Sequence, residues 1–170
     1  MNISDKVRNC NACPMRSNLP ECCTPVPGIG NGHKLMMIAE SVNETDVMVG
    51  EPFMCKNGQL LYRIIKDADI PLDDVYLTNL VKCNGKVTKK VITKCGNWLK
   101  EEIGEIQPEY IILFGKKVAE YFSLDYEDSL FKLQGKYYTC PSLHTLLMGS
   151  NKNLIQTKKG LKEIYGLCKK

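Results

Sequence analysis

The sequence lacks any long apolar run. No hydrophobic stretch approaches the ~20 residues that a helix needs to cross a bilayer, and residues 1–16 are polar, without the apolar centre of a secretory signal. We therefore expect a cytoplasmic protein that has no membrane partner. Internal repeats, linkers and low-complexity tracts are also missing, so we expect one domain over residues 1–170, which is long enough to bury a core, and a monomer.

The sequence also lacks a strong excess of charge of one sign. Its net charge is +4, from 23 Lys and Arg against 19 Asp and Glu. Such a balance suits a polyanion such as nucleic acid but does not require one. Cysteine, by contrast, is abundant, with nine in the chain. Because a cytoplasmic protein rarely has a disulfide framework, we expect some of these cysteines to bind a metal or a cluster.

Hydrophobic periodicity predicts strands that alternate with helices. Four short apolar runs are typical of buried strands: 35–39, 75–79, 110–114 and 137–140. Helical spacing covers four other ranges: 57–69, with Asn57 as its cap, 88–106, 116–122 and 153–168. This alternation predicts an α/β fold with a parallel sheet covered on both faces. Residues 40–50 have the length of a functional loop, and residues 1–34, rich in proline and glycine, are expected to form a ligand-bearing loop region.

Polar side chains follow or end several of the predicted strands. Glu40 follows the first run, Asn79 ends the second, and His144 comes shortly after the fourth. Sites in parallel α/β sheets form at the carboxyl ends of strands. The Asn79 amide offers an acceptor and two donors, so it can bind the edge of an imide-like base. Each residue alone also fits a structural role, as a solvated acid, a turn residue or a surface histidine, but their shared edge favours a site.

Four cysteines are spaced as ligands of one metal centre: Cys10, Cys13, Cys83 and Cys95. Four thiolates bind either zinc or a 4Fe-4S cluster, and the spacing does not distinguish the two. Cysteines are also common as small buried apolar side chains, which is the role that we expect for Cys55, Cys140 and Cys168. The positions of Cys22 and Cys23 stay open, since either could replace one of the four ligands.

Five blocks of the sequence carry a family resemblance. They read Met-Ile-Ala-Glu at 37–40, Gly-Glu-Pro-Phe at 50–53, Gly-Gln-Leu-Leu at 58–61, Thr-Asn-Leu-Val-Lys-Cys at 78–83 and Ser-Leu-His-Thr-Leu-Leu at 142–147. In this order and spacing, the blocks resemble the motifs of the family 4 uracil-DNA glycosylases, which bear an iron-sulfur cluster. The block at 78–83 is the most specific part, and the resemblance extends over nearly the whole chain.

The resemblance implies a three-layer α/β/α sandwich with a central four-stranded parallel sheet, and hydrolysis of the N-glycosidic bond of uracil, or of a C5-substituted uracil, in DNA. It implies that Phe53 stacks on a flipped base and that Asn79 binds its edge. His144 would donate toward the uracil O2, where negative charge gathers, and Glu40 would lie near the sugar. The four cysteines would hold a structural 4Fe-4S cluster, with zinc as the alternative.

The sequence departs from the family pattern in the first motif. Ser41-Val42-Asn43 stands where the family has Ala-Pro-Gly, and we expect Ser41 at the altered turn to contact the substrate. The resemblance implies that Asp46 takes the place of an acid that excludes a C5-methyl group, and that this shorter side chain would leave room for a larger C5 group. Two other functions therefore stay open, a weak or inactive DNA-binding module of a replication complex, or an enzyme that modifies or captures a base.

Overall fold

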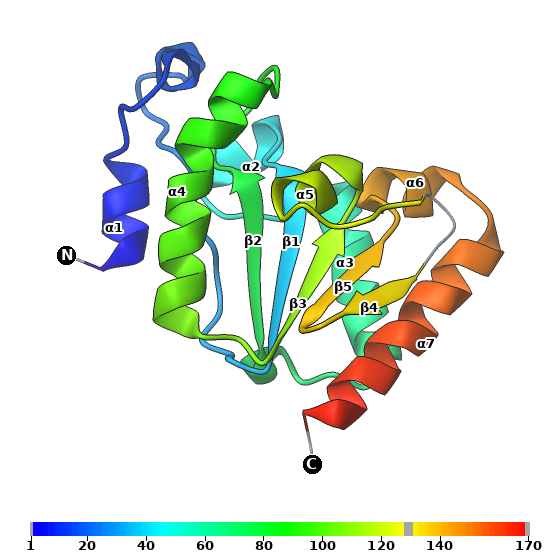
Figure 1. Cartoon of the computed structure of the whole chain (residues 1–170). Coiled ribbons are helices and arrows are strands. Elements are labelled where there is room, and N and C mark those ends of the chain that lie inside the picture. The colour runs from blue at the N-terminus through cyan, green and yellow to red at the C-terminus, as the bar shows by residue number, and fades with distance from the viewer. Residues whose placement is uncertain (1, 128–130, 169–170) are drawn as a thin grey trace.

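The structure is a computed structural model that describes residues 2–127 and 131–168. Within these residues, one sheet has five strands in the spatial order β2 (Val75–Val81), β1 (Leu35–Ser41), β3 (Tyr110–Phe114), β5 (Tyr137–Cys140) and β4 (Lys132–Gln134) (Figure 1). The first four are parallel, and β4 is antiparallel to β5. The four parallel strands are those expected from the sequence, and β4, with one apolar residue in three, extends them at the edge.

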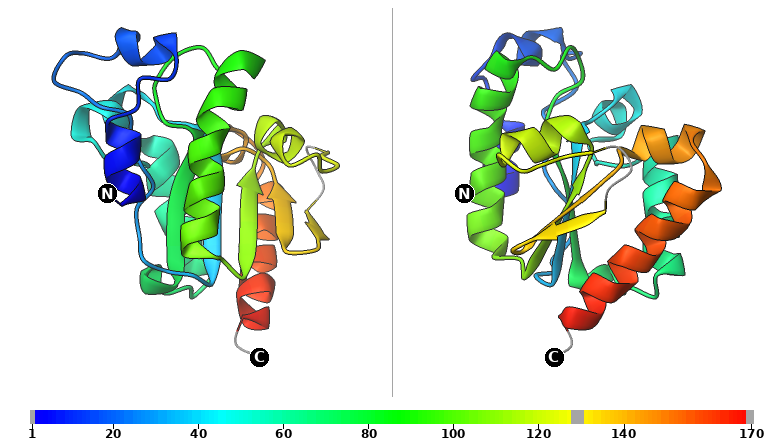
Figure 2. Two further views of the ribbon diagram at one scale, coloured as in Figure 1. Left: turned by 60° about the vertical axis from the view of Figure 1, so that its left-hand side comes forward. Right: turned by 45° about the vertical axis from the view of Figure 1, so that its right-hand side comes forward.

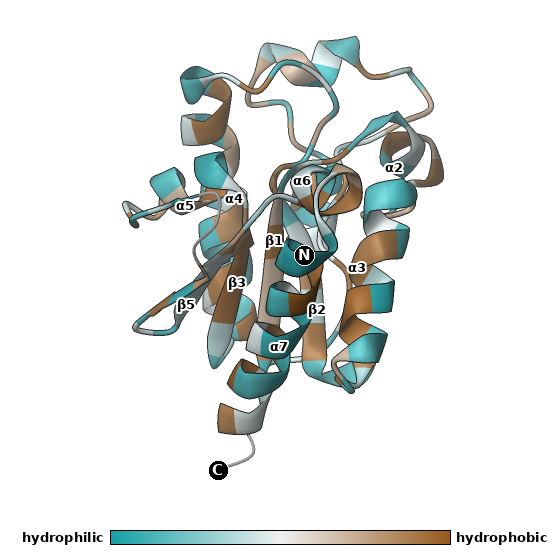
Figure 3. Cartoon of the chain, turned by 90° about the vertical axis from the view of Figure 1, so that its right-hand side faces the viewer, coloured by the Kyte–Doolittle hydropathy of each residue, from teal (hydrophilic) through white to brown (hydrophobic). Residues whose placement is uncertain are grey.

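Helices cover both faces of the sheet and complete three layers (Figures 1 and 2). One face packs against α3 (Lys56–Asp67), α6 (Leu143–Met148) and α7 (Asn151–Leu167). The other packs against α4 (Lys89–Ile106) and α5 (Lys116–Tyr121), and α1 (Ile3–Arg8) lies outside α4. The central strands, brown in Figure 3, are buried on both sides, which explains their unbroken apolar sequences. No helix within the described ranges is both long and apolar enough to cross a membrane.

Several helix boundaries differ from the sequence-based predictions. The expected loop at 40–50 contains a helix, α2 (Glu44–Val49), so that prediction is wrong. Asn43 and Asp46 bond each other's backbone N–H reciprocally, a capping box that makes six residues helical without a periodic apolar face. The cap predicted at Asn57 is also wrong, because α3 begins at Lys56 after Cys55. The region 1–34 is less irregular than expected, since it contains α1 and the 3-10 helix η1 (Pro14–Asn18).

A buried ion pair fixes α4 to β2. The Lys82 Nζ lies 2.6 Å from Glu102 Oε2, and both side chains are at most 1% exposed. Glu102 also accepts hydrogen bonds from the Thr78 hydroxyl (2.8 Å), from the Tyr76 hydroxyl (3.3 Å) and from the Gly28 N–H (3.0 Å). The network joins β2, α4 and the segment before β1, and so it sets the position of the strand that carries Asn79.

Candidate functional site

A pocket of about 290 Å³ opens at the carboxyl edge of the sheet. Its lining contains all the side chains that the sequence predicts to bind or act on a substrate: Glu40, Ser41, Asp46, Phe53, Asn79 and His144. They come from β1, α2, the loop before α3, β2 and α6, so parallel strand order brings together residues more than a hundred positions apart in sequence. The structure thus gathers all six residues, while their individual roles stay predictions.

Asn79 is the most unusual polar group of the pocket. It lies within β2, two residues before the strand ends at Val81, and not at the strand end expected from the sequence. Its side chain is 2% exposed. Within residues 2–127 and 131–168, its Nδ2 is the one buried side-chain nitrogen or oxygen without a hydrogen-bond partner. Leaving such a donor unpaired costs roughly 1–3 kcal/mol, so the site favours a ligand that supplies an acceptor.

Phe53 forms an apolar wall of the pocket from a strained backbone. Its φ is 64° and its side chain is 4% exposed. A bulky residue in the left-handed region costs about 1–3 kcal/mol, and such strain is concentrated at functional sites. Gly58, in the first turn of α3, makes this possible, because a Cβ there would lie 1.8 Å from the Phe53 carbonyl oxygen. The glycine of the Gly-Gln-Leu-Leu block therefore permits the close approach of α3 to the Phe53 loop.

Asp46 holds the loop between α2 and α3. Its Oδ1 accepts a hydrogen bond from the Met54 N–H at 2.7 Å, and its Oδ2 accepts one from the Asn43 N–H at 3.1 Å. The side chain is only 3% exposed although it lines the pocket. Sequence reasoning missed these two bonds, which make the carboxylate a rigid part of the wall and tie it to the backbone next to Phe53.

Glu40 has a partner that sequence reasoning missed. The Lys117 Nζ, from the first turn of α5, lies 2.7 Å from Glu40 Oε1, with the two side chains 47% and 40% exposed. An exposed pair of this kind contributes at most about 1 kcal/mol to stability. Its effect is to restrict the rotamers of Glu40 at the rim of the pocket. No motif signalled Lys117, which lies in an ordinary amphipathic stretch.

His144 reaches the pocket from the first turn of α6. The helix begins at Leu143 and is preceded by Ser142, whose Oγ accepts a hydrogen bond from the Thr145 N–H at 3.1 Å and shares another with the Thr145 hydroxyl at 2.8 Å. Ser142 thus caps the helix and fixes its start, with the exposed His144 in the first turn.

The four predicted cysteine ligands lie at one end of the molecule. The pKa of the Cys83 thiol is raised to about 12, first by burial and then by the nearby thiols of Cys95, Cys13 and Cys10, so the four are close enough to interact. Two sulfurs accept N–H donors: Cys10 from the Trp98 indole at 3.1 Å and Cys95 from a backbone N–H at 3.2 Å. In the described parts of the chain, no three Cys, His, Asp or Glu side chains are arranged around a metal position.

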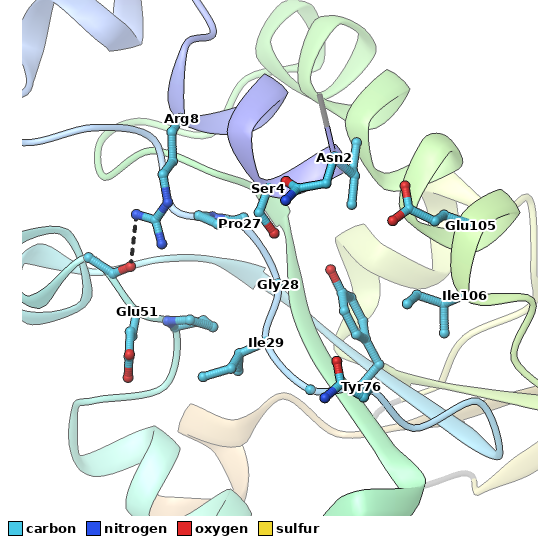
Figure 4. A pocket seen from close by; sticks show the side chains of 15 residues that line it. Asn2, Ser4, Arg8, Pro27, Gly28, Ile29, Glu51, Tyr76, Glu105 and Ile106 are labelled. Carbon is cyan, nitrogen blue, oxygen red and sulfur yellow. Dashed lines mark hydrogen bonds between the residues drawn. The ribbon is translucent and has the colours of Figure 1, made fainter.

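A second and larger cavity, of about 420 Å³, lies between α1, the segment 27–31 and the end of α4 (Figure 4). Its lining mixes Arg8 with Glu51 and Glu105, and Arg8 donates to the Gly50 carbonyl at 3.3 Å. It contains none of the six predicted residues and, within the described ranges, no buried side chain that lacks a partner. We therefore place the candidate site in the smaller pocket, where Asn79 lies.

A family model and several relatives of this chain indicate the same family. The model of the uracil DNA glycosylase superfamily matches residues 27–165. A type-4 uracil-DNA glycosylase of Saccharolobus solfataricus is 34% identical over 149 residues, which cover 81% of this chain and 66% of that protein. One of Thermotoga maritima is 30% identical over 138 residues (78% and 70%), and one of Archaeoglobus fulgidus 27% over 145 residues (80% and 71%). The chain thus spans about two thirds of the length of these relatives.

Proposed function

Because this chain belongs to the uracil DNA glycosylase superfamily and groups with its type-4 enzymes, we propose that it hydrolyses the N-glycosidic bond of uracil in DNA and leaves an abasic site. The observation that carries this proposal is the buried Asn79 amide, whose Nδ2 lacks a partner in a pocket with an aromatic wall. A uracil edge supplies carbonyl acceptors and an imide donor, which an Asn amide can pair with.

Base recognition requires that the target nucleotide leave the stack, because its edge is hidden in DNA. In the pocket, the Phe53 ring stacks on the flipped base, a contact worth roughly 1–3 kcal/mol. The Asn79 Nδ2 then donates to a base carbonyl, and its Oδ1 accepts from the imide N–H. The strain at Phe53 and the unpaired Asn79 donor both exist before the substrate arrives, so the free enzyme is preorganised for the base.

Bond cleavage moves electrons from the sugar to the base, so negative charge gathers on the uracil O2. His144 donates toward this oxygen and stabilises the charge. Glu40, oriented by Lys117, lies on the sugar side, where it holds the attacking water or stabilises the cationic sugar. Ser41, at the end of β1, contacts the substrate beside Glu40.

A 4Fe-4S cluster is the group that we propose for Cys10, Cys13, Cys83 and Cys95. All four donors are thiols, which suits iron-sulfur clusters as well as the alternative, zinc. The N–H groups directed at two of the sulfurs stabilise thiolates. The cluster would supply structure, since its four cysteines would tie the segment 10–13 to α4. Stoichiometric iron, together with broad visible absorbance, separates the cluster from zinc.

The test is base release by protein purified anaerobically with its iron. Matched oligonucleotides carry uracil, thymine or 5-hydroxymethyluracil, and the abasic product is measured. We expect release of uracil. Release of a C5-substituted base as well would indicate that the pocket beside Asp46 admits the larger group. If the iron-containing protein binds DNA but releases no base, the glycosylase proposal is wrong.

A further inference from the structure

The Cys23 sulfur contacts two other sulfur atoms, at a place that the candidate site and the four-cysteine group do not use. The Cys22 Sγ lies 3.7 Å from the Cys23 Sγ, which in turn lies 3.8 Å from the Met48 Sδ. Adjacent cysteines seldom direct both sulfurs to one point. Here both cysteines lie in a turn that the Cys23 N–H closes by donating to the Pro20 carbonyl at 2.9 Å.

The spacing of these sulfurs fits one metal ion. Three sulfurs at about 2.3 Å from an ion in their plane are separated by about 4 Å, so the two distances from the Cys23 sulfur match, within a few tenths of an ångström, the two edges that meet at one corner of a trigonal site. Two thiolates and a thioether are soft donors, the set that selects Cu(I) over harder ions. We propose that Cys22, Cys23 and Met48 bind one soft monovalent metal ion, independently of the proposed glycosylase function.

Access and anchoring at the three sulfurs suit reversible binding. Cys22 is exposed and Met48 is 61% exposed, so an ion can enter from solvent, while Cys23 is 5% exposed and fixes the inner side. Binding of Cu(I) forms two metal–thiolate bonds and one metal–thioether bond and releases two thiol protons to solvent. No electron is transferred. Because protons compete with the ion, affinity falls as the pH is lowered.

The ion would connect the segment 20–23 to α2. Met48 lies in α2, the helix that also carries Asp46 in the wall of the candidate pocket. The residue that ends this helix, Gly50, is already held by Arg8 of α1 (Figure 4). A second link at Met48 restricts α2 further, so a bound ion is expected to slow amide hydrogen exchange across 44–50.

The test is a titration of the iron-loaded protein with Cu(I) in competition with a chromogenic Cu(I) chelator, without oxygen. We expect one tight equivalent, no loss of iron, and three sulfur neighbours by X-ray absorption. We expect C22S and M48L each to weaken copper binding by at least about tenfold, because replacing even a residue that only hydrogen-bonds to a metal ligand lowers metal affinity by that factor. Both positions are exposed, so these variants are expected to fold.

The matched controls are C168S and M148L, which replace a cysteine and an exposed methionine elsewhere and should bind copper as the unmodified chain does. Copper should slow hydrogen exchange across 44–50 in the control M148L but not in M48L. Unchanged copper affinity in both C22S and M48L would overturn the proposal. Uptake of copper only as iron is lost would overturn it too, because the ion would then occupy the other cysteines.

Discussion

At the scale of single residues, Asn79 lowers the stability of the free protein but provides a donor for the ligand. Its buried Nδ2 is unpaired until a ligand arrives. Substituting Asn79 with Leu, which has a similar branched shape, removes this donor. We expect N79L to raise the free energy of unfolding by up to about 1–3 kcal/mol, measured by urea denaturation. N84L, at the exposed rim of the same pocket, serves as the control and should change stability by less than about 0.5 kcal/mol. A destabilised N79L would mean that the Asn79 amide is satisfied in the free protein.

His144 and Glu40 are expected to act on the two sides of the broken bond. H144A removes a donor toward the uracil oxygen, and such losses slow catalysis by about 10²–10³. E40Q keeps an oxygen for Lys117 but loses the carboxylate charge, with an expected slowing of about 10² or more. Single-turnover uracil release measures both. If both variants kept the unmodified rate, the two role assignments would be wrong.

At the scale of elements, the start of α3 determines the shape of the aromatic wall. G58A places a methyl group where the Phe53 carbonyl lies, so the loop must move. We expect a loss of several kcal/mol of stability, as in severe overpacking, together with weaker uracil release. G104A on α4, where a Cβ meets nothing within 4 Å, is the control and should stabilise by about 0.4–1 kcal/mol. Equal thermal shifts in the two variants would show that Gly58 is not required.

The buried pair between β2 and α4 gives a second prediction at this scale. E102Q leaves the Lys82 ammonium without its counter-ion at a site that is 1% exposed. Removing one partner of such a pair costs about 3–5 kcal/mol. Adding K82M to E102Q removes the unpaired charge, so the double variant should be more stable than E102Q alone in urea denaturation. Additive losses would mean that the two groups do not interact.

Local sequence defined the strands better than the helices. The runs at 110–114 and 137–140 have the observed bounds, because each ends at a glycine or proline, whereas β1 and β2 extend two residues beyond the prediction. The helix α2 was missed because its stability comes from the reciprocal Asn43 and Asp46 cap, a side-chain geometry that hydrophobic periodicity does not detect. Edge strand β4 depends on its pairing with β5, which is a tertiary contact.

At the scale of the whole molecule, α7 is fixed to the amino end of the sheet through Asp74. The Tyr165 hydroxyl donates to this carboxylate, which also lies 3.0 Å from Lys34 Nζ. The Tyr165 hydrogen bond is the main cause that lowers the pKa of Asp74, and Lys34 lowers it further against the effect of burial.

The direction of this shift makes stability depend on pH. The pKa of Asp74 is lower in the folded than in the unfolded chain, so its contribution is complete above the unfolded value of ~3.9 and is lost as the pH falls below it. We expect D74N to be less stable than the unmodified chain at pH 6, with the difference shrinking toward pH 3. Urea denaturation at both values measures this. A difference independent of pH would exclude the charge of Asp74 as its cause.

The order of motifs along the chain predicted which residues gather at the carboxyl edge, since parallel strands bring their ends together. Glu40, Asn79 and His144 were found in this way, whereas Ser41, Asp46 and Phe53 were expected only from the family resemblance. The contacts that hold these residues were not predicted, because Lys117 beside Glu40 and the Met54 N–H on Asp46 depend on side-chain packing between elements. One domain, a monomeric state and the cytoplasmic location stay predictions.

The most direct measurement is single-turnover release of uracil from an oligonucleotide, comparing the unmodified chain with N79L at equal iron content and equal folded fraction. If uracil is excised in the pocket at the carboxyl edge, the unmodified chain releases the base, and N79L, although at least as stable, is slower by tenfold or more. Equal rates of release in the two proteins would place the chemistry elsewhere in the molecule.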